Sequence, residues 1–229
     1  MLLERLLSIV LAAVGLMTGS MKTAMPDKDI DGTLFLVNRQ HALSEKYTPA
    51  PIRTTETVGM SQKMRDDAAL ALEQLFEGAK GDGVRLSTVS GYRSYSKQST
   101  IYARKVRNTG SEEEADRLVA RPGTSEHQLA LAMDLSTRNN TSLTSRFGET
   151  EEGKWVYAHG HEYGFIVRYP KGDEAITGYD YEPWHIRYVG IPYAEAIYKS
   201  GLPMETFMSH YKLELYDYLI QLTTNEVLP

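Results

Sequence analysis

The sequence predicts one α+β domain, in which a small antiparallel sheet is flanked by helices. Short segments of alternating apolar and polar residues, typical of strands, stand between segments whose apolar residues recur every three or four positions, as in helices. The two kinds of segment alternate at uneven spacing, and no internal repeat is present. This order suggests an α+β domain. A chain of 229 residues can hold one such domain with a substantial core, plus appendages.

The N-terminal segment is expected to direct export. Leu6 to Met21 contain no charged residue, and the twelve strongly apolar residues 6–17 fit the hydrophobic region of a signal peptide better than a full membrane span of about twenty residues. Arg5 supplies a positive charge before this region. Residues 1–24 are therefore predicted to be a signal peptide or an uncleaved membrane anchor, with a buried N-terminal helix as the alternative. The protein is expected at the outer face of the membrane or in the cell wall.

An arm and the first half of the domain are expected to follow. Residues 25–58 contain three prolines and one apolar run, which predicts an extended arm lying on the domain proper, residues 59–229. The periodicities then predict a helix from Ser61 to about residue 80, a strand at 84–90, and helices at 96–107 and 111–119, the last begun by a capping box from Ser111 to Glu114.

The second half of the domain is predicted to contain three more strands. They are expected at 129–135, 165–169 and 184–189, separated by a polar loop at 137–148, a short helix at 155–163 and a long connection at 170–180. The long connection is expected to border a substrate cleft, since loops of that length tend to be functional. A helix with proline in its first turn is predicted at 192–199, while the tail from 204 mixes two periods and receives no assignment.

Composition excludes several kinds of chemistry. The net charge of −5 provides no basic surface for nucleic acid, so that class of partner is not expected. The absence of cysteine excludes disulfides, thiolate metal sites and a cysteine nucleophile.

The first candidate site residues are His127 and Asp134. Asp134 ends an apolar run that begins at Leu129. A buried carboxylate must be paired, hydrogen-bonded or bound to a metal, because burying it alone costs several kcal/mol. Taken alone, a histidine and an aspartate seven residues apart are more often a structural pair than two metal ligands.

A second histidine near a glutamate favours a metal site. Glu182 precedes His185 by three residues at the start of another predicted strand. Two imidazoles, one carboxylate and a spare glutamate are the components of a catalytic zinc site, which needs three protein ligands, an open position and a base. We therefore predict that His127, Asp134 and His185 bind one Zn²⁺ and that Glu182 accepts a proton from water and returns it to the leaving amine.

Two more residues are expected to contact substrate. Arg93 follows a predicted strand beside glycine and aromatic residues, where it can neutralise negative charge on a substrate carbonyl oxygen, an effect typically worth about 3 kcal/mol. Ser125 is expected to hydrogen-bond substrate or orient His127, with a turn cap as the alternative.

These residues resemble the VanY-type D-alanyl-D-alanine carboxypeptidases, a group of zinc peptidases that includes the D,D-dipeptidases and shares its fold with the Hedgehog signalling domain. The resemblance spans about residues 33–210 and rests on four blocks in the same order, namely Ser90–Ser94 with Gln98, Ser125–Asp134, Tyr163–Pro170 and Tyr181–Gly190.

The resemblance implies a zinc-dependent exopeptidase that acts on peptidoglycan stem peptides ending in D-Ala. It places His127, Asp134 and His185 on metal ligands and Glu182 on the catalytic base. It also places Arg93, Gln98 and Ser125 on substrate-contacting positions. A monomer with one Zn²⁺ per chain is expected.

One position departs from the family pattern. Ala130 stands where the S-x-H-x-x-G-x-A-x-D pattern has glycine. The added methyl group is expected to narrow the cleft or shift the following strand, which bears on substrate preference more than on zinc binding.

Four alternatives to a D,D-carboxypeptidase stay open from the sequence. They are an L,D-carboxypeptidase acting on tetrapeptides, an endopeptidase cutting within the stem, a zinc-containing module that binds wall peptides without cutting them, and a cytoplasmic dipeptidase. Glu182 argues against the binding module, since passive binding needs no base. The dipeptidase requires that the N-terminal segment is not an export signal.

Overall fold

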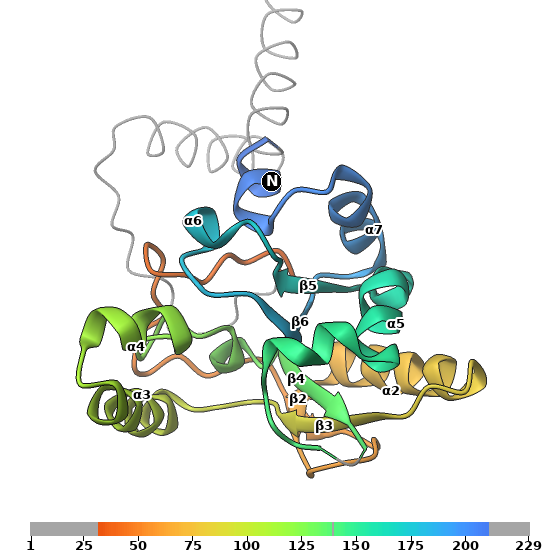
Figure 1. The fold of residues 1–229 in the computed structure, drawn as a ribbon, viewed down its shortest axis with the longest axis horizontal. Helices are drawn as coiled ribbons and strands as arrows, with labels where there is room; N and C mark the ends of the chain where they lie inside the picture. Colours follow the sequence, from red (N-terminus) through yellow and green to blue (C-terminus); the bar gives the residue numbers. More distant parts are fainter. Residues whose placement is uncertain (1–31, 139, 211–229) are drawn as a thin grey trace, which may run out of the picture. The chain divides into compact units, whose positions relative to one another are not determined.

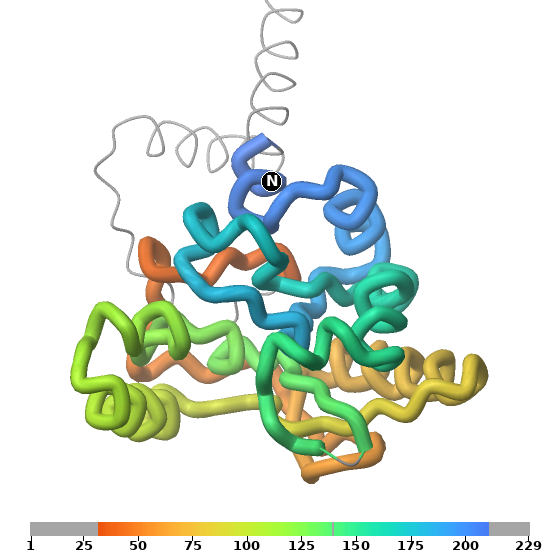
Figure 2. The backbone as a smooth tube through the Cα atoms, viewed as in Figure 1, coloured from red at the N-terminus to blue at the C-terminus, as the bar shows by residue number. Residues whose placement is uncertain are grey.

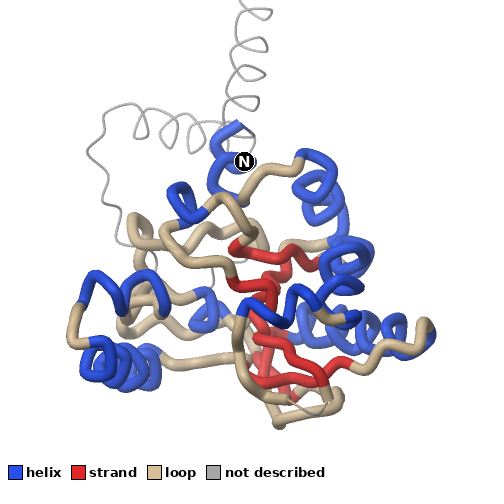
Figure 3. The backbone as a smooth tube through the Cα atoms, viewed as in Figure 1, coloured by secondary structure: helices blue, strands red, loops and turns tan. Residues whose placement is uncertain are grey.

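The computed structural model describes residues 32–138 and 140–210, and it contains a central four-stranded antiparallel sheet (Figures 1 and 3). The strand order is β3-β4-β6-β5, and a separate two-stranded sheet pairs β1 with β2. The bounds are β1 (Ile52–Thr54), β2 (Lys63–Arg65), β3 (Leu86–Ser90), β4 (Ala132–Thr137), β5 (Phe165–Tyr169) and β6 (Glu182–Tyr188). The predicted α+β class with a small antiparallel sheet is confirmed.

Helices surround the central sheet, with α3 and α4 on one side of it and α2 and α5 on the other in Figure 1. Hydroxyl caps begin three of them: Ser94, Ser111 and Thr150 accept hydrogen bonds from backbone N–H groups three residues on. The bounds are α2 (Asp66–Gly81), α3 (Tyr95–Thr109), α4 (Glu112–Leu118), α5 (Glu151–His159), α6 (Glu174–Thr177) and α7 (Ile191–Ser200), with 3₁₀ turns η1 (Glu126–Leu129), η2 (Ser145–Glu149) and η3 (Gly160–Tyr163).

The central sheet is buried on both faces, but the two faces differ in chemistry. Successive side chains of a strand point to opposite faces. Met133 and Leu135 of β4 belong to the apolar core that also contains Leu72 of α2. Between them along β4 lies Asp134, which faces the other way and is only 2% exposed. The sheet therefore has one apolar face and one buried polar face, and the polar face holds the candidate site.

Three elements start at least three residues away from the predicted position, each for an identifiable reason. Residues 63–65 pair with β1 instead of opening the helix, so tertiary pairing overrides the helical spacing there. The strand predicted at 129–135 begins only at Ala132, because Ala130 turns the chain with a φ of 57°. The helix predicted from Trp155 begins at Glu151, where Thr150 caps it.

The described part of the arm, from residue 32 on, contributes to the apolar core. Val37 and Leu43 are buried in the main apolar cluster. The backbone carbonyls of Thr33 and Phe35 each accept a hydrogen bond from Arg187 Nη2 at 2.8 Å. Figure 2 shows this segment, in red to orange, beside later parts of the chain. The arm is therefore an integral part of the folded unit.

The predicted signal peptide or anchor at 1–24 and most of the C-terminal tail lie outside the described residues. Among the residues that are described, no helix combines the length and the apolar character needed to cross a bilayer.

Candidate active site and metal centre

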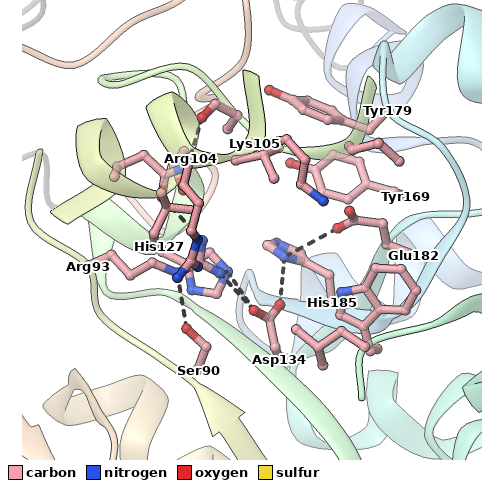
Figure 4. A pocket seen from close by; sticks show the side chains of 18 residues that line it. Ser90, Arg93, Arg104, Lys105, His127, Asp134, Tyr169, Tyr179, Glu182 and His185 are labelled. Carbon is pink, nitrogen blue, oxygen red and sulfur yellow. Dashed lines mark hydrogen bonds and ion pairs between the residues drawn. The ribbon is translucent and has the colours of Figure 1, made fainter. Parts of the chain in front are cut away.

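Strand register brings the predicted metal ligands together. Asp134 of β4 lies directly opposite His185 of β6, and on its other side it pairs with Ser90 of β3. The turn η1 delivers His127 to the same place. One donor atom from each of His127, Asp134 and His185 lies within 4.8 Å of the others, and all three residues are buried (Figure 4).

The donor distances suit a single zinc ion. His127 Nε2 lies 3.3 Å from Asp134 Oδ2, and His185 Nδ1 lies 3.1 Å from Asp134 Oδ1. Zinc–ligand bonds of about 2.0–2.1 Å in a tetrahedron separate neighbouring donors by about 3.3 Å. Two imidazole nitrogens and a carboxylate are ligands that Zn²⁺ prefers. The residues therefore fit zinc without rearrangement of the strands.

Hydrogen bonds behind the two histidines determine which nitrogen each can offer to a metal. His127 Nδ1 donates a hydrogen bond to the Gly91 carbonyl oxygen at 2.7 Å. The unprotonated Nε2 is therefore the atom that can bind a metal. His185 Nε2 lies 3.3 Å from Glu126 Oε2, so this histidine presents Nδ1 instead. Such partners fix the tautomer and the ring orientation of metal-binding histidines.

The charge states of two of the three ligands already suit a metal, whereas His185 would lose a proton on binding it. Burial, together with the positive charge of Arg93, lowers the pKa of His127 to about 4, so its imidazole is neutral. Burial opposes ionisation of Asp134, but the hydrogen bond from His185 and the positive charge of Arg93 outweigh it and hold the pKa of this carboxyl well below its usual range. A neutral imidazole and an ionised carboxylate are the forms that bind metal.

Arg93 lies among the predicted ligands. Its Nη2 lies 2.6 Å from His127 Nε2 and 2.7 Å from Asp134 Oδ2, so a metal would compete with it for these atoms. Its Nε donates to Ser90 Oγ at 3.0 Å and its Nη1 to Gln98 Oε1 at 3.1 Å. Gln98 is fully buried and donates in turn to the Ala120 carbonyl oxygen at 2.7 Å. Gln98 therefore holds Arg93 in place.

Glu182 stands at the edge of the ligand set. Its Oε2 lies 4.0 Å from His185 Nδ1, so it is near the metal position without being one of the three converging donors. Burial raises the pKa of Glu182 to about 8, the negative charge of Asp134 adds to this effect, and His185 opposes it. A bound dication would lower that pKa. A carboxyl group whose pKa lies near neutrality suits proton transfer in both directions.

A buried charge network lies behind His185, and it was not predicted from the sequence. Glu126 Oε1 accepts from Arg168 Nε at 2.8 Å and from Arg187 Nη1 at 2.7 Å, while Arg168 also pairs with Glu205. Burial opposes ionisation of Glu126, but the two arginines and His185 outweigh it and hold its pKa far below the usual range.

The sequence contained one signal for this network. Arg168 and Arg187 stand inside apolar strands, and a buried arginine requires an acidic partner. Arg187 does pair with Glu126.

The candidate site opens into a cavity of about 330 Å³. All predicted site residues line it, including Ser125 and Gln98. Tyr179, from the long connection expected to border a cleft, also lines it. Ala130 does not, because its methyl group is fully buried in the core. The narrowing of the cleft expected from this methyl group is therefore not seen.

Two histidines, an aspartate and a nearby glutamate in a cleft on a small antiparallel sheet define a metal-dependent hydrolase site. The VanY family model, described as D-alanyl-D-alanine carboxypeptidase, matches residues 61–191. The chain belongs to this family, so the predicted resemblance is confirmed.

Individual relatives support the same assignment. The putative carboxypeptidase YodJ of Bacillus subtilis is 43% identical over 189 residues, covering 80% of this chain and 69% of that protein. The LdcB LD-carboxypeptidase structure is 43% identical with a TM-score of 0.73, covering 77% of this chain and 86% of that one. The structure of a VanY D,D-pentapeptidase variant from a VanB-type resistance cassette, in complex with Zn(II), is 36% identical with a TM-score of 0.66. The match covers 77% of this chain and 98% of that one. The chain spans 69%, 66% and 63% of three curated relatives.

Proposed function

We propose that the protein is a zinc-dependent D,D-carboxypeptidase that removes the terminal D-Ala from peptidoglycan stem peptides. The observation that carries this proposal is the convergence of His127, Asp134 and His185 beside Glu182 in one cavity. The family model and the zinc-containing VanY relative support the same chemistry.

The chain's own residues account for the steps of hydrolysis. Zinc, when bound, would polarise the substrate carbonyl and make water more acidic. Glu182 takes a proton from the attacking water as the C–O bond forms, and it gives a proton to the amide nitrogen as the C–N bond breaks. The positive charge of Arg93 lies next to the ligand atoms, where it can offset negative charge on the carbonyl oxygen. The products are the shortened peptide and free D-Ala.

A second candidate is L,D-carboxypeptidase activity on tetrapeptide stems. The specific observation in its favour is that the LdcB LD-carboxypeptidase structure has both a higher identity and a higher TM-score than the zinc-bound VanY structure. Both activities use the same metal and base, so only the identity of the residue before the scissile bond separates them.

The experiment is mass spectrometry of pentapeptide and tetrapeptide stems incubated with the zinc-loaded protein. Loss of one alanine from the pentapeptide is expected, and loss only from the tetrapeptide would assign the L,D activity. If neither peptide loses alanine, the carboxypeptidase proposal fails. Glu182→Ala serves as the matched control. It should retain zinc and lose turnover by about 10²–10⁴-fold, because only the proton transfer is removed.

We also propose that the protein acts outside the cytoplasm as a monomer. Its N-terminal segment either anchors it to the membrane or is cleaved off as a signal peptide. The support is the uncharged apolar stretch at 6–17 after Arg5. Fractionation of the source cells tests this, and recovery of the full-length chain only from the cytosol would contradict it.

A further inference from the structure

Two cations on α3 line the candidate site and have no partner among the described residues. Arg104 and Lys105 line the same cavity as the metal ligands, on the helix face that also contributes Gln98 and Ile101. Within residues 32–138 and 140–210, neither cation makes a hydrogen bond or an ion pair. Nearby Arg121 is different, because it pairs with Asp116 at 2.8 Å. The two α3 cations are therefore available to an anionic ligand.

The opposite wall of this part of the cavity is aromatic and also carries an unused polar group. Tyr169 packs against His185 and against Tyr179, with ring centroids 4.9 and 4.7 Å apart. The hydroxyl group of Tyr179 is buried and makes no well-oriented hydrogen bond among the described residues, although Thr124 and Arg39 lie near it. Figure 4 shows the two tyrosine rings projecting from the β5–β6 side toward the labelled side chains of α3. A buried polar group without a partner is costly, so this hydroxyl is a candidate ligand contact.

Charge and distance indicate which part of a substrate would reach these groups. Gln98 holds Arg93 beside the ligand atoms, and the backbone of Lys105 lies seven residues beyond that of Gln98, about 10 Å along the helix at 1.5 Å per residue. In a carboxypeptidase substrate, the terminal carboxylate lies only about 4 Å from the scissile carbon. An extended peptide advances about 3.3 Å per residue, so two residues and a side chain span about 10 Å in the upstream direction. The α3 cations therefore suit an upstream carboxylate rather than the terminal one.

We propose that Arg104 and Lys105, facing Tyr169 and Tyr179, form a subsite for a side-chain carboxylate upstream of the scissile bond. Diaminopimelate at the third position of a stem peptide carries such a group, whereas lysine at that position does not. This inference rests on the proposed function, because it takes the substrate to be a stem peptide lying in this cavity. The subsite makes the enzyme selective for stems with a free carboxylate at the third residue.

The test uses three pentapeptides ending in D-Ala-D-Ala that differ only at the third residue. This residue is diaminopimelate with a free side-chain carboxylate, the same residue with that group amidated, or lysine. The α-carboxylate of the second residue is amidated in all three. With the zinc-loaded full chain, kcat/KM for the free carboxylate is expected to exceed that for the amide by about tenfold, with lysine lowest. Equal values for the three peptides would overturn the proposal.

Variants on one helix identify the residues responsible. Arg104→Ala and Lys105→Ala should each bring the ratio between the free and amidated peptides close to one. Arg107→Ala is the matched control, because Arg107 is exposed on the same helix, does not line the cavity and loses the same charge. It should keep the wild-type ratio. If the double variant of Arg104 and Lys105 also keeps that ratio, the subsite does not lie there.

A binding measurement separates this inference from the proposed function. Calorimetry with zinc-loaded Glu182→Ala protein compares the affinities of the same three peptides in the absence of cleavage. If the wild-type protein cleaves none of them, the proposed function fails. Binding that is about tenfold tighter for the free carboxylate, and that is lost with Arg104→Ala, would still support the subsite. Equal affinities would refute it.

Discussion

At the scale of single residues, the partners behind the ligands matter as much as the ligands. His185 can bind metal through Nδ1 because Glu126 holds its Nε2. Glu126 can remain a buried anion because Arg168 and Arg187 compensate its charge. The identity of one donor atom therefore depends on a carboxylate that does not itself face the metal position.

We expect Glu126→Ala to weaken zinc binding by about 10–100-fold, because His185 loses the contact that orients it. The same change leaves two buried arginines without their shared anion and should lower the free energy of unfolding by about 3–5 kcal/mol. Chelator competition and urea unfolding measure the two effects. Glu126→Gln keeps an acceptor oxygen and should lose less zinc affinity than Glu126→Ala. Unchanged zinc affinity in both variants would refute the orienting role.

The predicted residues and the missed ones differ in the kind of signal they leave in the sequence. His127, Asp134, Glu182 and His185 were predicted because metal chemistry requires those residue types at strand ends. Arg104 and Lys105 were missed because cations on an amphipathic helix are normally solvated, and only the folded chain shows that they line the cavity.

At the scale of elements, the turn between η1 and β4 joins the segment that carries His127 to the strand that carries Asp134. Ala130 ends η1 with a φ of 57°, the one non-glycine residue with positive φ among the described residues. The left-handed conformation costs an L-residue about 1–2 kcal/mol, which glycine avoids. The departure from the family pattern therefore affects backbone energy rather than cleft width.

Ala130→Gly is expected to raise the free energy of unfolding by about 0.5–1 kcal/mol, since relief of the left-handed strain exceeds the added entropy of the unfolded chain. Ala132→Gly, in the extended backbone of β4, is the control and should lower it by a similar amount. Urea unfolding of the metal-free variants measures both. A destabilised Ala130→Gly protein would contradict the strain at this turn.

Element types were predictable where the periodicity was local, as in β5, whose predicted range 165–169 was correct. The sequence did not reveal β2, because Lys63–Arg65 form a strand only through pairing with β1. Strand register was also hidden, since nothing local specifies that Asp134 faces His185. The position of β2 and the strand register therefore depend on long-range pairing, which the local spacing of residues does not specify.

At the scale of the whole molecule, the polar face of the sheet connects distant parts of the chain to the site. Arg187 links Glu126 to the carbonyls of Thr33 and Phe35 in the arm, and Arg168 links Glu126 to Glu205 near the end of the described residues. Folding of the arm and organisation of the ligands are therefore coupled through one buried network.

The metal-free protein should become less stable as pH rises from about 6.5 toward 9. Burial opposes the imidazolium of His185, but hydrogen bonds to Asp134 and Glu126 outweigh it and raise its pKa to about 9, against 6.5 in the unfolded chain. Glu182 acts in the same direction, because its pKa is about 8 in the folded chain against 4.5 in the unfolded chain. The folded chain binds more protons in these ranges, so the stabilisation from His185 is present below pH 6.5 and is lost as pH rises toward 9, while the contribution of Glu182 is lost between about pH 4.5 and 8.

Urea unfolding at several pH values, with a chelator and with saturating zinc, measures this effect. The free-energy difference between zinc-loaded and metal-free protein should grow with pH, because metal replaces the proton on His185. A metal-free protein that is more stable at pH 8.5 than at pH 6.5 would contradict the assignment of these charges.

Anomalous diffraction at the zinc edge, from crystals of the zinc-loaded chain, would show whether three residues distant in sequence hold one zinc ion. We expect one strong peak about 2.0–2.1 Å from His127 Nε2, His185 Nδ1 and an Asp134 carboxylate oxygen, with Glu182 beside it and not bonded to it. A peak elsewhere, or the absence of zinc from this cluster at full loading, would rule out this metal centre.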